Sequence, residues 1–263
     1  ELEQAKLTSA NSSLPLEGKV ALVTGVGSGI GRATALKLLS EGCAVVGLDI
    51  LADFADSTAS FLAIQCDVTD PVAVARALSR GVFKFGGVDM LVSNAGVFPP
   101  SCMLEHMEMD NWDRSLAVNL SSHMHLLKAC IPYLKSGFDP SVVIIGSKNV
   151  PAPGPGAAAY SVAKAGLTQL ARVAALELGE FGIRVNTLHP NSVYDTAIWN
   201  EEVLAKRAQH YGLSVDEYKS NNVLKTQITS ADVATSVVRL LGTDFLKTTG
   251  AQIAVDGGND RVI

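Results

Sequence analysis

The stretch Val20-Ala-Leu-Val-Thr24, followed at once by Gly25-Val-Gly-Ser-Gly-Ile-Gly31, decides the fold. The apolar run predicts a buried strand, and residues 32–40 beyond the glycines carry a helical pattern. Strand, glycine turn and helix form the phosphate-binding start of a dinucleotide fold. Glycines let the backbone approach a pyrophosphate, and a helix N-terminus offers it unpaired N–H groups. Glycine-rich turns are common, so this stretch alone indicates the fold better than the activity.

Apolar strands and helical patterns alternate along the rest of the chain. The predicted strands are 20–24, 44–49, 61–66, 88–93, 142–146, 183–188 and 252–255. The predicted helices are 32–40, 71–84, 111–135, 157–180 and 230–241. This alternation predicts an α/β protein with one Rossmann-type doubly wound domain, whose mainly parallel seven-stranded sheet carries helices on both faces. Ligands bind at the carboxyl ends of the strands in such sheets.

Several polar residues fall where the predicted strands end. Asp49 ends the second strand 24 residues after Gly25, about where a carboxylate meets the adenosine ribose hydroxyls. Its charge would repel a 2′-phosphate, and residues 26–30 contain no Arg or Lys, so NAD is favoured over NADP. Asn94, Ser147 and His189 also fall at strand ends, and the sheet is expected to gather all of them on one side.

Tyr160 and Lys164 lie four residues apart on a predicted helix and therefore share one of its faces. A free tyrosine titrates near pH 10, so ionising it near neutrality requires roughly 3 to 4 kcal/mol of stabilisation. A lysine charge about 4 Å away, at an effective dielectric near 20, supplies about that much. The pair is credible as an acid or base. A tyrosine and a lysine at this spacing are more often found on an exposed helix face, so an active-site role needs other residues at the same place.

The composition excludes several classes of protein. The chain has 263 residues and a formal net charge of −5, which without a basic cluster argues against nucleic acid and anionic membranes as partners. No apolar run approaches the roughly 18 residues of a membrane span, and the start lacks a signal-peptide pattern, so we expect a cytoplasmic protein. The four cysteines show no paired spacing, and His123 and His125 would point apart on a helix. No metal site or disulfide framework is expected.

Two segments differ in character from the rest of the chain. Residues 1–14 read as a linker-like tail, and with Glu1 in place of Met they suggest a piece of a longer protein; a processed terminus is the alternative. The domain then covers 15–263. Residues 191–225 are polar and rich in aromatic residues, and are predicted to form a substrate lid. An insertion that packs on the surface or on a neighbouring subunit is the alternative.

With these residues in place, the sequence resembles the short-chain dehydrogenase/reductases. The matching motifs run in order from Pro15 onward. They are Thr24-Gly25-x-x-x-Gly29-Ile30-Gly31, Asn94-Ala-Gly96, Asn119, Ser147 and Tyr160-x-x-x-Lys164. The resemblance implies that Tyr160 exchanges the proton of the substrate oxygen and that Ser147 orients that oxygen. It implies that Lys164 lowers the pKa of Tyr160 and holds the nicotinamide ribose, and that Asn119 maintains a water chain.

The resemblance also implies a set of cofactor contacts and a homo-oligomer. The cofactor-binding residues would be Gly25, Ser28, Gly29, Ile30, Gly31, Asp49, Asp67, Val68, Asn94, Ala95, Gly96, Tyr160, Lys164, Pro190 and Val193. The oligomer would be a tetramer or dimer, with the helices around Asn119 and Tyr160 in its interface. Four positions depart from the usual pattern: Ser93, Gly146, Asn191, which replaces a glycine, and Asp195, which replaces a threonine that contacts the carboxamide.

Shorter matches resemble the C-terminal dehydrogenase half of bifunctional rhamnulose-1-phosphate aldolase/short-chain dehydrogenases. They are Leu2-Glu-Gln-Ala-Lys-Leu7, Ser147-Lys-Asn-Val150, His189-Pro-Asn-Ser-Val193, Ile198-Trp199 and Lys247-Thr-Thr-Gly250. There the aldolase half releases lactaldehyde, and the other half is thought to oxidise it. This implies NAD-dependent hydride transfer to or from a small hydroxy or carbonyl compound, with lactaldehyde as the leading candidate. A polyol or 3-keto reductase is the alternative, and a catalytically silent NAD-binding module is an alternative of another class.

Three residues are candidates for contact with the substrate. Lys148 and Asn149 directly follow the predicted catalytic serine, and we expect one of them to bind a substrate hydroxyl or anionic group. A charge at a strand end over a pocket is costly unless it is paired. The alternative is that Lys148 extends into solvent. Trp199 in the predicted lid is the third candidate.

Overall fold

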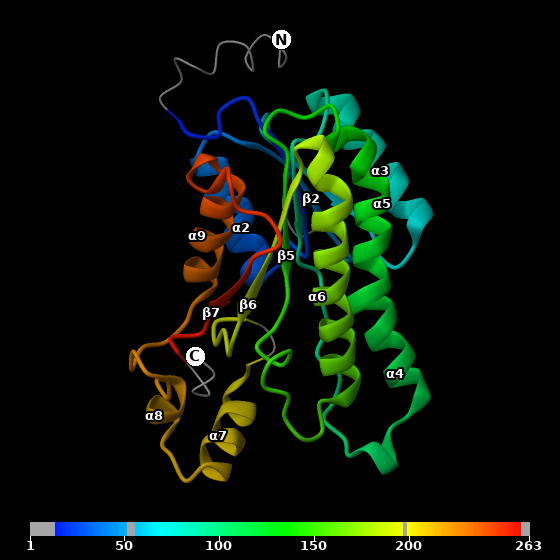
Figure 1. The fold of residues 1–263 in the computed structure, drawn as a ribbon. Coiled ribbons are helices and arrows are strands. Elements are labelled where there is room, and N and C mark those ends of the chain that lie inside the picture. Colours follow the sequence, from blue (N-terminus) through cyan, green and yellow to red (C-terminus); the bar gives the residue numbers. More distant parts are fainter. Residues whose placement is uncertain (1–13, 52–55, 197–198, 259–263) are drawn as a thin grey trace.

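Seven parallel strands form the central layer of the computed structural model, which describes residues 14–51, 56–196 and 199–258 (Figure 1). They occur in the order β3-β2-β1-β4-β5-β6-β7. Their bounds are β1 Val20–Thr24, β2 Ala44–Asp49, β3 Phe61–Gln65, β4 Met90–Ser93, β5 Ser141–Ile145, β6 Arg184–Pro190 and β7 Gln252–Val255. The predicted fold class is confirmed, and every strand pair of this sheet is parallel. Residues 1–13 of the predicted tail and Ile198 lie outside the described residues.

Helices cover both faces of the sheet, and each face has its own apolar core (Figure 1). On one face lie α2 Gly29–Ser40 and α9 Ser230–Leu241, and on the other α3 Pro71–Phe85, α5 Ser122–Leu134 and α6 Ala158–Leu178. Local sequence explains the starts of some of these helices. Asp70 caps α3 by accepting the Val72 N–H at 2.8 Å, and Pro71 occupies the first helical position. Within the described residues, no helix has the length and apolar character to cross a membrane.

The predicted helix 111–135 is interrupted. The structure has α4 Met109–Leu116, a π-helical turn over Ala117–Ser121, and then α5. Such turns insert an extra residue into a helix and often occur at functional sites. Asn119 lies in the middle of this one. The pattern of apolar residues continues across the interruption, which is why the sequence predicted a single helix.

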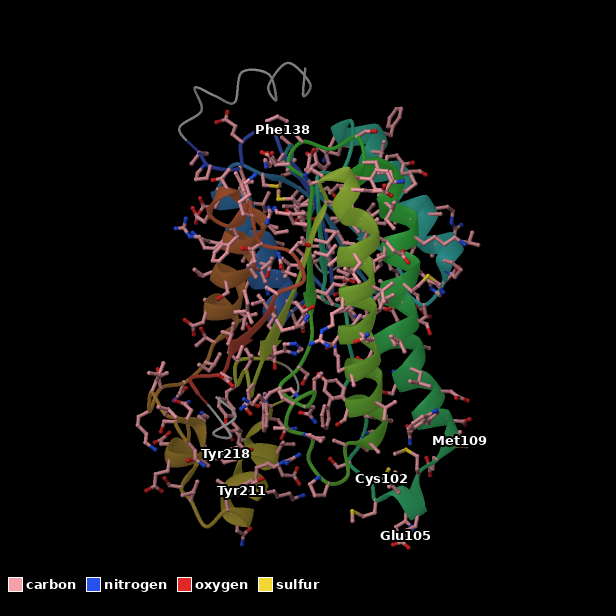
Figure 2. The ribbon with its side chains drawn as sticks, viewed as in Figure 1. Cys102, Glu105, Met109, Phe138, Tyr211 and Tyr218 are labelled. Atoms are coloured by element: carbon pink, nitrogen blue, oxygen red, sulfur yellow. The ribbon has the colours of Figure 1, made fainter. Side chains whose placement is uncertain are left out.

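Helices α7 Glu201–His210 and α8 Val215–Lys219 lie beyond the carboxyl edge of the sheet (Figure 1). The four aromatic residues of segment 191–225 pack on one another there. The ring centroids are 5.0 Å apart for Tyr194 and Trp199, 6.0 Å for Tyr194 and Tyr218, and 5.7 Å for the stacked pair Tyr211 and Tyr218. Figure 2 shows Tyr211 and Tyr218 beside these two helices. The segment therefore has a small apolar core of its own, and its role as a lid stays a prediction.

Three short 3₁₀ turns complete the described chain: Leu104–His106, Gly179–Phe181 and Thr243–Phe245. The four cysteines are all free thiols. Cys43, Cys66 and Cys130 are buried, whereas Cys102 is partly exposed. Burial raises the pKa of the Cys66 thiol to about 11 and that of Cys130 to about 12, so both stay protonated near neutral pH.

Candidate active site

Ser147 and Tyr160 meet at the carboxyl edge of the sheet. Ser147 lies just beyond the end of β5, and Tyr160 lies in the first turn of α6. Their side chains are hydrogen-bonded to each other, and the Ser147 Oγ also accepts the Asn149 N–H at 3.1 Å. The Phe98 ring packs against Tyr160 with the ring centroids 4.7 Å apart. The serine and tyrosine hydroxyls are therefore placed to contact one substrate oxygen.

Lys164 shares the helix face of Tyr160, as predicted, but its charge does not govern the tyrosine. The lysine is 2 % exposed, its Nζ donates to Ile145 O at 2.8 Å, and it lies 5.9 Å from the Tyr160 ring centroid. Burial lowers the pKa of Lys164 to about 7. Burial also raises the pKa of Tyr160, and the hydrogen bond from Ser147 lowers it only in part. The net shift of the Tyr160 pKa in this structure is thus upward, because burial disfavours the charged form, and the lowering of that pKa by Lys164 stays a prediction.

Asn119 holds the loop after β4 against the π-helical turn. Its Nδ2 donates to Val97 O at 2.9 Å, and its Oδ1 accepts the Val97 N–H at 3.0 Å. The same amide nitrogen lies 3.1 Å from Ser115 Oγ. The side chain is therefore fully engaged in positioning the segment that follows Gly96. Its predicted part in a water chain stays a prediction.

The glycine turn is closed tightly on itself and on Asn94. Gly25 has φ +72°, in the left-handed region, and a Cβ on Gly31 would lie 2.1 Å from Gly25 O and 2.7 Å from Asn94 Nδ2. The Asn94 amide donates to Thr24 O at 2.8 Å. Thr24 Oγ1 accepts the N–H groups of Asn94 and Ala95, each at 3.0 Å. Sequence reasoning included Thr24 in the motif without a role. The position of its hydroxyl at the end of a buried apolar strand could have indicated that Thr24 binds a neighbouring main-chain segment.

The residues around this turn fit a dinucleotide. The N-terminus of α2 has no side-chain cap from Ser28 and no acidic residue in its first turn, so its N–H groups suit an anionic group. Asp49 lies over the turn, where its Oδ2 accepts the Gly27 N–H at 2.8 Å and its Oδ1 accepts the Leu51 N–H at 3.0 Å. The pyrophosphate would lie at the helix end, and Asp49 would face the ribose.

The remaining predicted cofactor residues lie along the same edge. Asp67 Oδ1 accepts the Thr69 N–H at 2.9 Å and the Thr69 hydroxyl at 2.7 Å, and Val68 is buried. Pro190 ends β6, and its carbonyl accepts the Lys148 N–H at 3.1 Å. Val193 is buried in the loop that follows.

In that loop, the chain places Thr196 over the glycine turn. A Cβ on Gly29 would lie 3.0 Å from Thr196 Cγ2, and Thr196 Oγ1 donates to Val193 O at 2.8 Å. Asp195 instead faces α9, where its Oδ1 accepts the Ser230 N–H and hydroxyl, each at 2.9 Å. Sequence reasoning compared position 195 with the family's threonine and missed the threonine one residue later.

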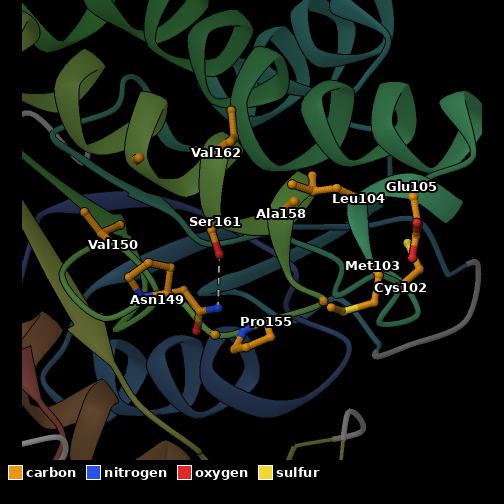
Figure 3. A pocket seen from close by; sticks show the side chains of 14 residues that line it. Cys102, Met103, Leu104, Glu105, Asn149, Val150, Pro155, Ala158, Ser161 and Val162 are labelled. Carbon is orange, nitrogen blue, oxygen red and sulfur yellow. Dashed lines mark hydrogen bonds between the residues drawn. The ribbon is translucent and has the colours of Figure 1, made fainter.

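The three substrate candidates have partners within the protein. Lys148 is 3 % exposed, and its Nζ lies 2.6 Å from Asp256 Oδ2, so the solvent-exposed alternative is wrong. Asn149 Nδ2 donates to Ser161 Oγ at 3.3 Å (Figure 3). Trp199 packs against Tyr194 and Tyr218. Their contact with substrate stays a prediction.

A cavity of about 670 Å³ lies beside Asn149 and Ser161 (Figure 3). Its wall is mainly apolar and comes from the segments around Met103 and Pro155 and from the start of α6, including Val162. Asn149 and Ser161 contribute polar atoms to it. Ser147, Tyr160 and Lys164 do not line it, so the cavity is separate from the hydroxyls that would meet a substrate oxygen.

Comparisons with known proteins agree with this geometry. The sequence model of a family described as enoyl-(acyl carrier protein) reductase matches residues 25–260. An uncharacterised oxidoreductase of Bacillus subtilis, YuxG, is 33 % identical over 273 residues; the match covers 98 % of this chain but 40 % of that relative. An uncharacterised NAD-dependent oxidoreductase of Mycobacterium tuberculosis is 32 % identical, covering 92 % of this chain and 96 % of its own. The solved structure of Thermoplasma acidophilum aldohexose dehydrogenase in ligand-free form is 29 % identical with a TM-score of 0.82, covering 92 % and 94 % of the two chains.

Proposed function

Because the chain belongs to the short-chain dehydrogenase/reductase family, we propose that it is an NAD-dependent oxidoreductase that interconverts a hydroxyl and a carbonyl group on a small substrate. The observation that carries the proposal is the meeting of Ser147 and Tyr160 at the sheet edge, with the buried Lys164 Nζ 5.9 Å from the centroid of the Tyr160 ring. A site with no chemistry to perform would have no physical reason to bury a lysine at such cost.

The protein residues move the proton and orient the oxygen. When bound, the nicotinamide supplies or accepts the hydride. Ser147 donates a hydrogen bond to the substrate oxygen, and Tyr160 gives that oxygen a proton during reduction or takes one from it during oxidation. Burial raises the pKa of Tyr160, so the resting phenol is protonated and ready to donate. Lys164, whose pKa burial lowers to about 7, can exchange a proton near neutral pH.

Asp49 supports the assignment of NAD. Its carboxylate is held over the glycine turn by the N–H groups of Gly27 and Leu51, where it would accept hydrogen bonds from ribose hydroxyls. A 2′-phosphate in the same place would meet a fixed negative charge. No Arg or Lys occurs in residues 26–30 to offset it.

We propose lactaldehyde as the leading substrate, with the chain acting as the dehydrogenase part of a longer protein that carries an aldolase domain. The short sequence matches around Ser147, His189 and Lys247 support this. So does the fact that the chain spans only 40 % of the length of its Bacillus subtilis relative. The likeness to an aldohexose dehydrogenase supports the alternative of a polyol or sugar substrate.

We also propose a homo-oligomer, a tetramer or dimer, that packs through α6. Val162, Val173 and Leu176 recur at helical spacing on this helix and are 49 %, 40 % and 83 % exposed. Exposed apolar side chains in a stripe are typical of protein interfaces. Light scattering on the wild type and Leu176→Lys tests this. We expect the variant to dissociate, and a wild-type monomer would contradict the proposal.

The function is tested by a substrate screen with NAD and NADP in both redox states. The panel holds short hydroxyaldehydes including lactaldehyde, polyols, aldoses and 3-keto compounds, and Tyr160→Phe is assayed beside the wild type. We expect Tyr160→Phe to lose about 10²- to 10⁴-fold in kcat while NADH fluorescence shows unchanged binding. Turnover of polyols without turnover of lactaldehyde would exclude the narrower substrate. Equal inertness of both proteins, with NADH still bound, would favour a silent module.

A further inference from the structure

His189, near the end of β6, lies between the main chain of Ser147, just beyond β5, and the side chain of Gln252, the first residue of β7. The ring is 6 % exposed. Its Nδ1 accepts the Ser147 N–H at 3.1 Å and lies 2.9 Å from Ser147 O, and its Nε2 lies 2.6 Å from Gln252 Oε1. Peptide oxygens only accept, so Nδ1 contacts the main chain of Ser147 in either tautomer of the ring, as acceptor of its N–H or as donor to its O. The ring thus joins the catalytic segment to β7.

The His189 ring packs against Gly146, where the absence of a side chain leaves room for it. A Cβ on Gly146 would lie 2.6 Å from His189 Nδ1 and 2.7 Å from its Cε1. Real Cβ atoms do not approach other atoms so closely, so any larger residue at 146 would displace the imidazole. Gly146 and His189 are therefore a sterically matched pair.

Ser147 needs a holding group because it lies past the regular ladder. The last pair in the β5–β6 register is Ile145 with Leu188. Beyond it, Gly146 N–H still donates to Leu188 O at 2.7 Å and Lys148 N–H to Pro190 O at 3.1 Å. Ser147 lies between these two bonds, and its own N–H goes to the imidazole.

We propose that His189 is a positioning residue that fixes the main chain of Ser147, and through it the Ser147 hydroxyl aimed at Tyr160. This rests on the proposed function, in which Ser147 orients the substrate oxygen. Gln252 holds the far side of the ring. The neighbouring Lys148–Asp256 ion pair, at 2.6 Å, ties the next residue to the end of β7 as well. Two polar contacts thus brace the serine segment from the two ends of β7: the part-buried contact of His189 with Gln252 and the buried ion pair of Lys148 with Asp256.

Three substitutions at His189 separate positioning from simple packing. His189→Ala removes both contacts. His189→Asn keeps an acceptor near the place of Nδ1 without reaching Gln252, whereas His189→Gln reaches toward Gln252 without an acceptor near Ser147. We expect His189→Ala to lower kcat on the order of 10- to 100-fold, with KM for NADH within about twofold of wild type. Asn should recover most of the lost kcat and Gln little of it.

Asn186 provides a matched control. It lies on the same strand and is 1 % exposed; its Nδ2 donates to Thr248 O at 2.9 Å, and its Oδ1 accepts the Ala251 N–H at 3.0 Å. These contacts lie on the amino side of β7, away from Ser147. Asn186→Ala should lower stability about as much as His189→Ala and leave kcat unchanged. An equal loss of kcat in both variants would mean that general loosening of β6 explains the effect, and would overturn the proposal.

Gly146→Ala approaches the same contact from the other side. Because the added methyl group must push the ring off Ser147, we expect its kcat loss to resemble that of His189→Ala. The double variant should be no worse than His189→Ala alone. Full additivity would contradict the shared contact.

Amide hydrogen exchange of the peptide around Ser147 gives a readout independent of turnover. Protection should fall in His189→Ala and persist in His189→Asn. If the wild type is inactive on every substrate but exchange behaves this way, the proposed function fails and the positioning stands. If exchange around Ser147 is unchanged in His189→Ala, or kcat stays within twofold of wild type, the positioning role is overturned.

Discussion

Lys148 Nζ and Asp256 Oδ2 lie 2.6 Å apart beyond the ends of β5 and β7, and the two side chains are 4 % and 7 % exposed. They are 108 residues apart in the sequence. Asp256 also accepts the Gly258 N–H through its Oδ1 at 2.9 Å. The ion pair therefore anchors both the residue after Ser147 and the turn that leaves the sheet.

Removing one partner of this pair should destabilise the fold strongly. Lys148→Met leaves the Asp256 carboxylate buried and unpaired, which costs about 3 to 5 kcal/mol. The double variant Lys148→Met/Asp256→Leu should recover much of that loss, because no charge is left buried. Urea unfolding measures both. An unchanged KM for the best substrate in Lys148→Met would remove the predicted substrate contact of this lysine.

Lys164→Met should stabilise the protein near neutral pH while abolishing turnover. Burial lowers the pKa of Lys164 from 10.5 to about 7. Between those pH values the unfolded chain binds a proton that the folded protein does not, so this lysine makes stability rise with pH across the window. Below about pH 7 the buried lysine charge lowers the free energy of unfolding by its full desolvation penalty, up to about 5 kcal/mol. The hydrogen bond to Ile145 O offsets about 1 kcal/mol of this penalty.

The measurement is urea unfolding of wild type and Lys164→Met at several pH values. The gain in free energy of unfolding should be largest at pH 6.5 and shrink as the pH approaches 10. A variant that is less stable than wild type at pH 6.5 would show that burial of the Lys164 charge does not destabilise the folded protein.

Substitution of Asp49 should change cofactor choice. Asp49→Asn keeps an oxygen that can accept the Gly27 N–H and removes only the charge. We expect it to shift the ratio of kcat/KM for NAD over NADP about 10- to 100-fold toward NADP. Asp49→Ala, which also loses the hydrogen bond, should weaken binding of both cofactors in addition. A wild-type preference for NADP would overturn the assignment.

Gly31→Ala should disrupt the cofactor turn, whereas Gly86→Ala should not. The new Cβ at 31 would meet Gly25 O at 2.1 Å, but at Gly86 it meets nothing within 4 Å. Gly86 has φ +84°, so alanine there carries only backbone strain of about 1 to 2 kcal/mol. Gly31→Ala should lose more stability than this and also lose NADH binding, measured by fluorescence. Intact binding in Gly31→Ala would contradict a closed turn.

Local pattern predicted most of the fold. All seven strands and their parallel arrangement followed from apolar runs separated by helical periodicity, and Asp70-Pro71 marked the start of α3 where the structure has it. The ends of elements were less well predicted. The strand β4 begins at Met90 instead of 88, and β6 runs on to Pro190. The sequence predicted a continuous helix around Asn119 and missed the π-helical turn there, because the apolar pattern runs on through the turn.

The sequence by itself determined which groups the site contains. Parallel strands end at one edge, so Asp49, Asn94 and Ser147 had to come together, and four-residue spacing had to align Tyr160 with Lys164. What those groups touch was decided only by tertiary structure. The imidazole of His189 reaches Ser147 over 42 residues, and Thr196 lies over the turn where Asp195 was considered. The physical reason is that the spacing of apolar residues along the sequence shows which side of a helix or strand is buried, but not what it is buried against. Partners and pKa values depend on which distant side chains share the same dry space.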